Sequence, residues 1–392
     1  MAQDIKQKTA LVTRFGGLGD NAPCEVVCRQ LKKKGYHVTF ATRFDGDHMR
    51  TADIFYKNPS FDEVLDYKVV GPWGTRCVKS QYGWVSINTI YSNFDLVIDY
   101  MNIIEGNSTS PLSKGGPENV WESSRSSNWV NWYDLHLAWA NIDPNSVSDD
   151  EKRPKFNLTK EEKAEFDKIK KRYSQVFVLQ TTASSLSRTW FQGEKLAKQL
   201  LKEYPDSVVF FWDDKDHQWL ANDKSGASVL RIEGMSPLRL SMCLIHISSC
   251  YVGADTGFTH IAEGLDKKHI AIYSTVPAWT RNKYYKYQVT IDPGIKHPEF
   301  YTFNLGLGDP LRAIEGEKLL TEREKLVWKL YIGKVPLKDA AEQLNSDMQG
   351  AEMELKALMA KRETFDRQQS KALSSVTMEE VLEKVKEIIN EG

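Results

Sequence analysis

The chain has 392 residues, of which 41% are hydrophobic and 27% charged, a composition typical of a soluble globular protein with two or three domains. Its formal net charge of −1 excludes a global electrostatic attraction to nucleic acid or anionic lipid. No run approaches the roughly 20 apolar residues that span a bilayer, and residues 1–10 lack an apolar signal core, so we expect a cytoplasmic protein. The five cysteines are scattered, which favours reduced, buried thiols over disulfides or a zinc site.

The first half of the chain predicts a parallel sheet covered by helices. An apolar strand at 9–15 leads into a glycine-rich turn at 16–20. A helix follows, with Pro23 near its first position and Gly35 just past its end. A strand at 37–42 completes a strand–helix–strand unit, which implies parallel pairing. Further strands are expected at 63–66 and 94–99, and the aromatic residues within 119–142 indicate a mostly helical stripe that is either core or cleft lining.

The second half repeats this alternation after a polar linker at 143–154. Helices are expected at 161–173, 193–203, 237–247 and 258–265, and strands at 176–179, 207–211, 229–232, 250–253 and 269–273. Two doubly wound domains follow from this pattern, and the cleft between them is the expected ligand site. We therefore predict an α/β chain with a Rossmann-like domain at 1–150, a second at 151–315, a helical insertion at 316–375 and a C-terminal helix at 376–392.

The insertion has leucines at roughly helical spacings. Residues 320–344 loosely resemble the helix-turn-helix of sigma-type regulators, in which a third helix presents basic groups to the major groove. Here that stretch, 350–356, carries acidic residues instead. A helical hairpin for self-association or for contact with the acceptor is the alternative interpretation.

The turn after the strand at 250–253 has the residues expected of a phosphate site. Gly257 and its small neighbours let the backbone approach a ligand, and the N-terminus of the next helix offers unpaired N–H groups and partial positive charge. Asp255 can cap that helix, Thr256 can offer its hydroxyl, and His260 lies one turn in. The plainer interpretation is a capped strand–helix turn.

Five motifs in order resemble those of glycosyltransferase family 9, the heptosyltransferase family. They lie at 14–20, 58–65, 94–99, 180–190 and 236–262, within a resemblance that covers about residues 8–300. The resemblance implies the GT-B fold, in which two Rossmann-like domains face a cleft. It also implies metal-independent transfer of a sugar with inversion at the anomeric carbon. The donor is a nucleotide-diphosphate sugar, with a heptose as one candidate, and the acceptor is a hydroxyl on a glycan or protein. No cofactor is implied, and an ADP-sugar is the favoured donor.

Site residues carry over from the family by position. Asp20 falls at the catalytic carboxylate, and a carboxylate base suits an acceptor hydroxyl that must lose its proton; otherwise Asp20 is a helix N-cap before Pro23. Arg188 falls where the family has a lysine that meets the donor phosphates. The other implied donor-binding residues are Thr181, Thr182, Asp255, Thr256, Gly257 and His260, with Asp213 near the nucleoside, and the acceptor-side candidates are Arg14, Gly17 and Gly19.

The segment 272–285 departs from the family pattern, which leaves the sugar open. Three alternatives stay beside the main hypothesis. One is a glycosyltransferase that modifies nucleic acid, against which the near-zero net charge counts. Another is a non-catalytic scaffold, which would tolerate loss of Asp20. The last is a nucleotide-sugar epimerase, for which no further acid and base set is identified.

Overall fold

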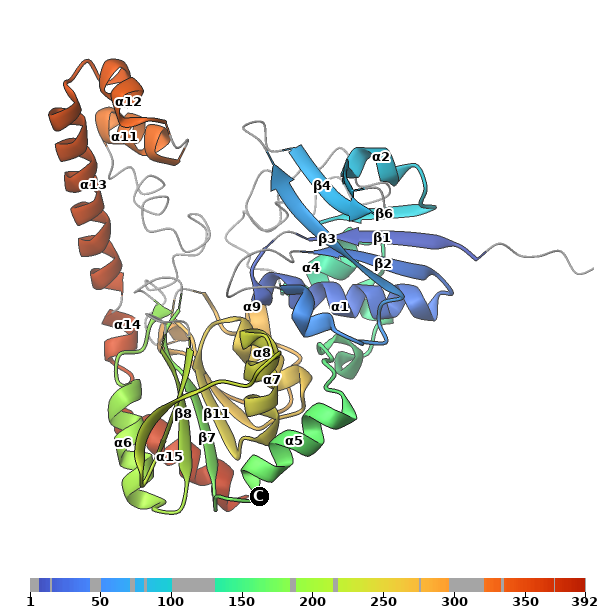
Figure 1. Ribbon diagram of the computed structural model, residues 1–392, viewed down its shortest axis with the longest axis vertical. Coiled ribbons are helices and arrows are strands. Elements are labelled where there is room, and N and C mark those ends of the chain that lie inside the picture. Colours follow the sequence, from blue (N-terminus) through green and yellow to red (C-terminus); the bar gives the residue numbers. More distant parts are fainter. Residues whose placement is uncertain are drawn as a thin grey trace, which may run out of the picture.

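The computed structural model describes residues 7–14, 16–42, 51–70, 75–80, 83–100, 131–183, 188–213, 218–274, 276–295, 321–332, 335–369 and 371–391. Two β-sheets, one from each half of the chain, carry helices on their faces, and the insertion projects away from both (Figure 1). The strand orders are β5-β4-β3-β2-β1-β6 and β10-β9-β8-β7-β11-β12-β13. The predicted α/β class with two sheet domains is confirmed.

The first sheet is parallel at its centre and ends in an antiparallel hairpin. β1 pairs with β2 and β6, and β2 pairs with β3, all in parallel register, as the sequence predicts. The antiparallel strands β4 and β5 were not predicted. The bounds are β1 Thr9–Thr13, β2 His37–Thr42, β3 Glu63–Val70, β4 Thr75–Ser80, β5 Gly83–Ser86 and β6 Leu96–Asp99, with helices α1 Leu18–Lys33, η1 Thr51–Phe55 and α2 Ile87–Tyr91.

Helix α1 begins earlier than expected. Pro23 is its sixth residue and lies inside the helix, so the expectation of Pro23 near the first position was wrong. The helix starts upstream because Asp20, in its first turn, accepts a hydrogen bond from the Gly17 N–H at 2.8 Å. That bond satisfies a backbone donor that no helical carbonyl can reach. Asp20 is therefore a first-turn residue of α1 rather than its N-cap.

The second sheet also has a parallel centre and an antiparallel edge. Val176 and Val178 of β7 pack with α5, α7 and α8, while Phe177 and Leu179 pack with α6 and α15. This alternation buries both faces of the strand, as the continuous apolar run predicts. The strand bounds are β7 Val176–Gln180, β8 Val208–Asp213, β9 Gln218–Asp223, β10 Gly226–Leu230, β11 Cys250–Ala254, β12 His269–Ile272 and β13 Gln288–Ile291.

The strand expected at 229–232 within a parallel alternation is not as predicted. It is β10, which ends at Leu230 and pairs antiparallel with β9, and β9 pairs antiparallel with β8. Gly226 has φ +107°, a conformation that suits glycine in the tight turn of the hairpin. The remaining helices of the two domains are α4 Trp132–Trp139, η2 Pro144–Ser146, η3 Asp149–Lys152, α5 Lys160–Lys170, α6 Gly193–Glu203, α7 Pro237–Ile247, α8 Gly257–Gly264, α9 Trp279–Asn282, η5 Pro293–Ile295 and α15 Met378–Asn390.

The insertion forms a small helical unit with its own apolar core. Helices α11 (Glu322–Ile332), α12 (Leu337–Gln343) and α13 (Met348–Gln369) are followed by α14 (Lys371–Ser374). Asn345 has φ +48° and turns the chain between α12 and α13, as in a helix-turn-helix. Residues 316–320 of the predicted insertion lie outside the described residues. The core residues of the unit are Val327, Leu330, Ala340, Ala341, Leu344, Ala351 and Leu358.

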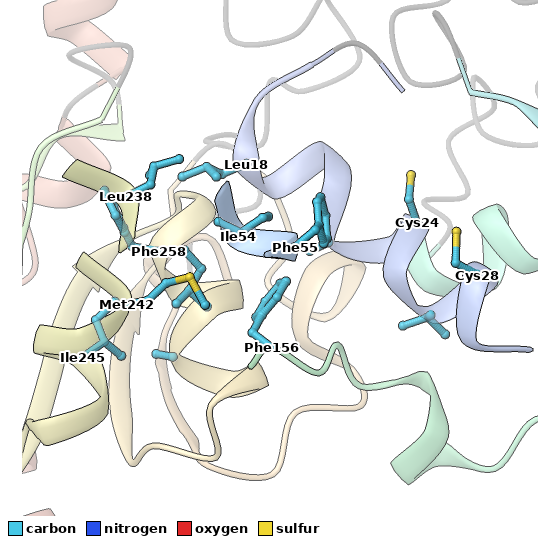
Figure 2. Close-up of a cluster of buried hydrophobic side chains, with 14 of the residues drawn as sticks. Leu18, Cys24, Cys28, Ile54, Phe55, Phe156, Leu238, Met242, Ile245 and Phe258 are labelled. Carbon is cyan, nitrogen blue, oxygen red and sulfur yellow. The ribbon is translucent and has the colours of Figure 1, made fainter. Parts of the chain in front are cut away.

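One apolar cluster runs across the junction of the two domains. Ile54 and Phe55 of η1 meet Met242 of α7 and Phe156, which lies just after the linker (Figure 2). All five cysteines of the chain are buried with free thiols, as predicted, and Cys24 and Cys28 belong to this cluster. Within the described segments, no helix combines the length and the apolar character that crossing a membrane requires.

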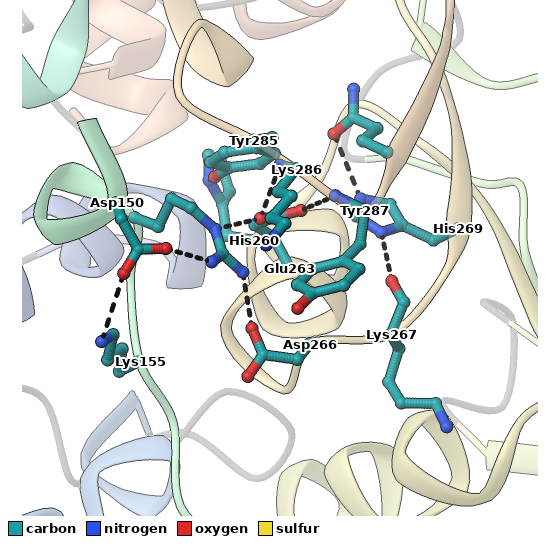
Figure 3. A network of polar contacts seen from close by, with 12 residues as sticks. Asp150, Lys155, His260, Glu263, Asp266, Lys267, His269, Tyr285, Lys286 and Tyr287 are labelled. Carbon is teal, nitrogen blue, oxygen red and sulfur yellow. Dashed lines mark hydrogen bonds and ion pairs between the residues drawn. The ribbon is translucent and has the colours of Figure 1, made fainter.

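The predicted linker is fixed to both domains by buried charges. The Arg153 guanidinium donates to Glu263 and Asp266, at and just beyond the end of α8, and also to Asp150. Glu263 has no exposed surface and also accepts the backbone N–H groups of residues 286 and 287, at 2.9 and 3.1 Å (Figure 3). Toward the first domain, Arg29 Nη2 donates to the Arg153 carbonyl at 2.7 Å. The domains are therefore held in one arrangement through this segment.

Candidate active site

The N-termini of α1 and α8 meet at the domain junction. A Cβ at Gly257 would collide with the side chain of Leu18 and lie 3.0 Å from the Gly19 nitrogen. A Cβ at Gly19 would lie 3.3 Å from the ring of His260. The close approach of the helices thus requires glycine at 257 and leaves little room for a side chain at 19. Each helix N-terminus carries partial positive charge, so their convergence favours an anion beside them.

Asp20 is oriented by a buried cation and a backbone amide. Arg14 is fully buried, and its Nη1 donates to the Tyr100 carbonyl at 2.7 Å. Its Nη2 lies 3.5 Å from Asp20 Oδ1, while Asp20 Oδ2 accepts the Gly17 N–H. The Asp20 side chain keeps 26% of its surface exposed, so a substrate hydroxyl can reach it. Among the acceptor-side candidates, Arg14, Gly17 and Gly19 all lie around this carboxylate.

The loop after β7 is tied to the loop after β11. Gln180 Oε1 accepts a hydrogen bond from Thr256 Oγ1 at 2.7 Å, and Gln180 Nε2 donates to the Thr182 carbonyl. Arg188 Nη1 donates to the Asp255 carbonyl at 3.4 Å. Because Thr256 bonds Gln180, its side chain does not cap α8. The first amides of α8 are therefore left without a side-chain cap, as an anion site requires.

The two threonines of the first loop point in different directions. The side chain of Thr181 lies against Gly193 at the start of α6, and its carbonyl accepts the Trp190 N–H at 2.8 Å. Thr182 Oγ1 is buried and has no hydrogen-bond partner among the described residues. Of the two hydroxyls, that of Thr182 is the one available to a ligand. Asp213 ends β8 on the same sheet edge, opposite Gln218 of β9.

His260 is held between the two domains. It is 3% exposed, and its Nδ1 contacts the hydroxyl of Tyr133 at 3.1 Å and that of Tyr285. Burial lowers the pKa of His260 to about 3, and Arg281 adds to this effect, so the ring is neutral at physiological pH. The sequence predicted a ligand contact for His260, and the structure places its ring against α1. Tyr133 and Trp139 of the aromatic stripe are buried, whereas its members before residue 131 lie outside the described residues.

Two site residues were missed by the sequence analysis. Arg281 of α9 is 3% exposed, and its guanidinium lies 3.0 Å from the ring centroid of Trp132 of α4. Burial lowers the Arg281 pKa to about 9, although the carboxylates of Asp255 and Asp20 both oppose that effect. The departure from the family pattern at 272–285 was the signal present in the sequence, but it did not show where the arginine points.

His136 of α4 is the second missed residue. It is fully buried, and burial lowers its pKa to about 3. Its Nδ1 lies 2.7 Å from the Trp132 carbonyl, which can only accept, so Nδ1 carries the proton. Its Nε2 therefore presents a lone pair, and that atom has no hydrogen-bond partner among the described residues. The ring centroid of His136 lies 4.7 Å from that of Tyr100, the residue whose carbonyl accepts a hydrogen bond from Arg14.

Residues 137–293, which include the loops after β7 and β11 and helix α8, match the family model of glycosyltransferase family 9 (heptosyltransferase). This segment is therefore similar to the heptosyltransferases of family 9. Its structure is similar to that of the glycosyl transferase family 9 protein from Veillonella parvula DSM 2008, with a TM-score of 0.53 at 11% identity, covering 81% of this chain and 98% of that one. It is also similar to Escherichia coli ADP-heptose lps heptosyltransferase II, with a TM-score of 0.50 at 14% identity over 72% of this chain and 90% of that one. No curated protein sequence matches the chain.

These likenesses show the fold, which is that of the GT-B glycosyltransferases. The matched segment begins at residue 137, so the first sheet, α1 and Asp20 lie outside it. The three-dimensional contact between α1 and α8 is what brings Asp20 to the glycosyltransferase segment. The arrangement offers a carboxylate, two helix N-termini and buried arginines at one junction.

Proposed function

We propose that this glycosyltransferase transfers a sugar, of the heptose type, from an ADP-sugar to an acceptor hydroxyl on a glycan or protein, with inversion at the anomeric carbon. The observation that carries this proposal is the convergence of the N-termini of α1 and α8 beside Asp20. One domain thereby supplies a base and the other an anion site at the same junction. A non-catalytic scaffold would have no need to keep this set together.

Asp20 is the proposed general base. An acceptor hydroxyl attacks the anomeric carbon of the donor from the face opposite the diphosphate, and Asp20 takes its proton as the new glycosidic bond forms. Arg14 and the Gly17 amide fix the direction of the carboxylate, so little reorganisation is needed when the acceptor binds. Inversion follows from this single displacement.

The diphosphate leaves toward the N-terminus of α8. Negative charge builds on the leaving oxygen, and groups fixed in advance stabilise it most. We assign this role to the uncapped amides after Thr256, to the guanidinium of Arg188 and to the hydroxyl of Thr182. Asp255 and Gly257 shape the turn, and Asp213 is the candidate for the nucleoside end.

We expect ADP-heptose to raise the melting temperature of the protein, and UDP-, GDP- and dTDP-sugars to raise it less. A ligand at about 100 times its Kd stabilises the native state by about 2.7 kcal/mol, which is readily measured by thermal shift. The Arg188→Met variant should lose most of this shift, because one phosphate contact is removed. Lys283→Met is the matched control, since it removes an exposed cation whose ammonium lies 3.6 Å from Asp134. If no nucleotide-sugar shifts the wild type, the donor-site assignment fails, and a response to UDP- or GDP-sugars alone would replace ADP as the donor nucleotide.

We also propose that the insertion mediates self-association. Large apolar side chains are exposed on it, with Met353 at 63%, Met348 at 56% and Leu337 at 40%. We infer that these exposed side chains form the contact between chains. On α13, Glu352 pairs with Lys356 at 2.7 Å and so neutralises one of the cations that DNA phosphates would need.

Light scattering coupled to gel filtration tests this second proposal. The wild type is expected to elute with a mass above the 44.9 kDa of one chain at micromolar concentrations. Met353→Glu should shift the protein toward the monomer, because a charge would be buried in the contact. Lys198→Glu on α6, where Lys198 is exposed, serves as the control. A monomeric wild type at the same concentration contradicts the proposal.

A further inference from the structure

A buried cation joins the two halves of the candidate site. Arg281 belongs to the second domain, yet its guanidinium lies over Trp132 of the first domain, 3.0 Å from the ring centroid. A hydrogen bond from Asn131 Nδ2 to the Trp279 carbonyl, 2.9 Å long, crosses the same junction two residues away. Helices α4 and α9 are thus held face to face at this point.

The charges around Arg281 come from both domains. Asp255 belongs to the loop after β11, and Asp20 belongs to α1 of the other domain, and both carboxylates favour the charged guanidinium. Other ionisable groups near it are Arg188, Tyr273 and the neutral His260 ring, and the buried rings of Tyr133 and His136 also feel its charge. A single cation at the contact of α4 with α9 is therefore attracted by carboxylates of both domains.

Burying the charged guanidinium of Arg281 at this position costs folding free energy. Its charge is desolvated, as the lowered pKa of Arg281 indicates, and an apolar side chain would pack against the indole without that cost. In some proteins a buried charge specifies one arrangement over others, and we apply that idea to Arg281. The arrangement specified here is the one that faces Asp20 toward the Asp255 loop.

We propose that Arg281 is a positioning residue that sets the register of the Asp20 helix against the Asp255 loop, and so the distance between base and donor. The proposal rests on the proposed function for Asp20 and Asp255. Because Arg281 acts on geometry rather than on nucleotide contacts, its loss should lower kcat far more than it weakens nucleotide binding. A displacement of about 1 Å between reacting groups is sufficient to cost on the order of 10²-fold in rate.

The test compares Arg281→Met, Arg281→Lys and Lys283→Met with the wild type. We expect Arg281→Met to lower kcat with ADP-heptose by about 10²-fold, while the calorimetric Kd for ADP changes by less than about threefold. Arg281→Lys should recover part of the loss, because it restores the charge but not the planar stack on Trp132. Lys283→Met, an exposed cation two residues away, should behave as the wild type. Equal kcat in Arg281→Met and wild type, or an ADP Kd that weakens in step with kcat, would overturn the proposal.

Hydrogen exchange separates failure of this inference from failure of the proposed function. In Arg281→Met, amides of α4 and α9 should exchange faster than in the wild type, whereas those of α6 should be unchanged, and this readout needs no substrate. If the wild type does not use ADP-heptose but the exchange difference is seen, the register role stands and the donor assignment fails. If Arg281→Met does not fold, Trp132→Leu takes its place, because it removes the ring and leaves the charge. Unchanged exchange across the junction in the folded variant would overturn the inference.

Discussion

Replacing Asp20 by asparagine is expected to lower kcat by about 10²–10⁴-fold while leaving nucleotide-sugar binding nearly unchanged. Asparagine has almost the same shape, and its Oδ1 can still accept the Gly17 N–H that starts α1, so the helix and its contact with α8 should survive. What is lost is the ability to take a proton from the acceptor. Initial rates of ADP release in the presence of acceptor, together with the thermal shift produced by ADP-heptose, measure the two quantities separately.

The matched control for this variant is Asp206→Asn. It removes the same charge from a side chain that is 73% exposed and paired with Lys224 on the surface. We expect its rate to stay within about twofold of the wild type, because exposed pairs contribute little. If Asp20→Asn retained full activity, the base would be another group. If the wild type transferred no sugar, the result would favour the non-catalytic scaffold.

Replacing Arg153 by methionine is expected to be the most destabilising single change in the domain junction. The substitution leaves Glu263 as a fully buried carboxylate without its main cation, and breaking such a pair costs about 3–5 kcal/mol. Burial works against the charged guanidinium, but the hydrogen bond to Glu263 raises the Arg153 pKa above its ordinary value, which shows how strongly the pair is coupled. For a domain of this size, the melting temperature should fall by roughly 5–15 °C.

Lys198→Met supplies the control for Arg153→Met. Lys198 pairs with Glu194 at 2.7 Å on α6, but both side chains are about three-quarters exposed. Such a pair contributes about 0–1 kcal/mol, so the melting temperature should move by no more than about 2 °C. Calorimetric scans at neutral pH compare the two variants directly. An Arg153→Met protein that melts within that same small range would mean that Glu263 is satisfied by the two backbone amides alone.

The turn after β11 shows what local pattern can predict. The apolar strand, the small residues around Asp255 and the helix that follows are local features, and the structure has all three. The suggested cap by Asp255 was wrong, because Thr256 is the N-cap and no side chain caps α8. β1 and the glycine turn before α1 are also as expected, although the helix starts upstream of the position that Pro23 suggested. Local hydrogen bonding decided that difference, because Asp20 bonds to Gly17 three residues away.

The antiparallel edges were beyond this kind of reasoning. Strands β4, β5 and β9 are short, and whether a strand pairs in parallel or antiparallel fashion depends on where the chain returns in space. The turn at Gly226 was a local signal for the β9–β10 hairpin. Because we expected strands and helices to alternate, we predicted a parallel strand at 229–232, whereas these residues begin in the antiparallel strand β10.

The sequence by itself determined the α/β class, the two sheets and the glycine turns, because strands, helices and turns depend largely on neighbours within a few residues. Asp20 and Arg188 were assigned instead by the resemblance to glycosyltransferase family 9. Only the tertiary structure decided that α1 and α8 touch, that Arg153 reaches Glu263, and that Arg281 lies over Trp132. These contacts join residues more than 100 positions apart. They depend on how two domains pack against each other, and no periodicity or local motif encodes that packing.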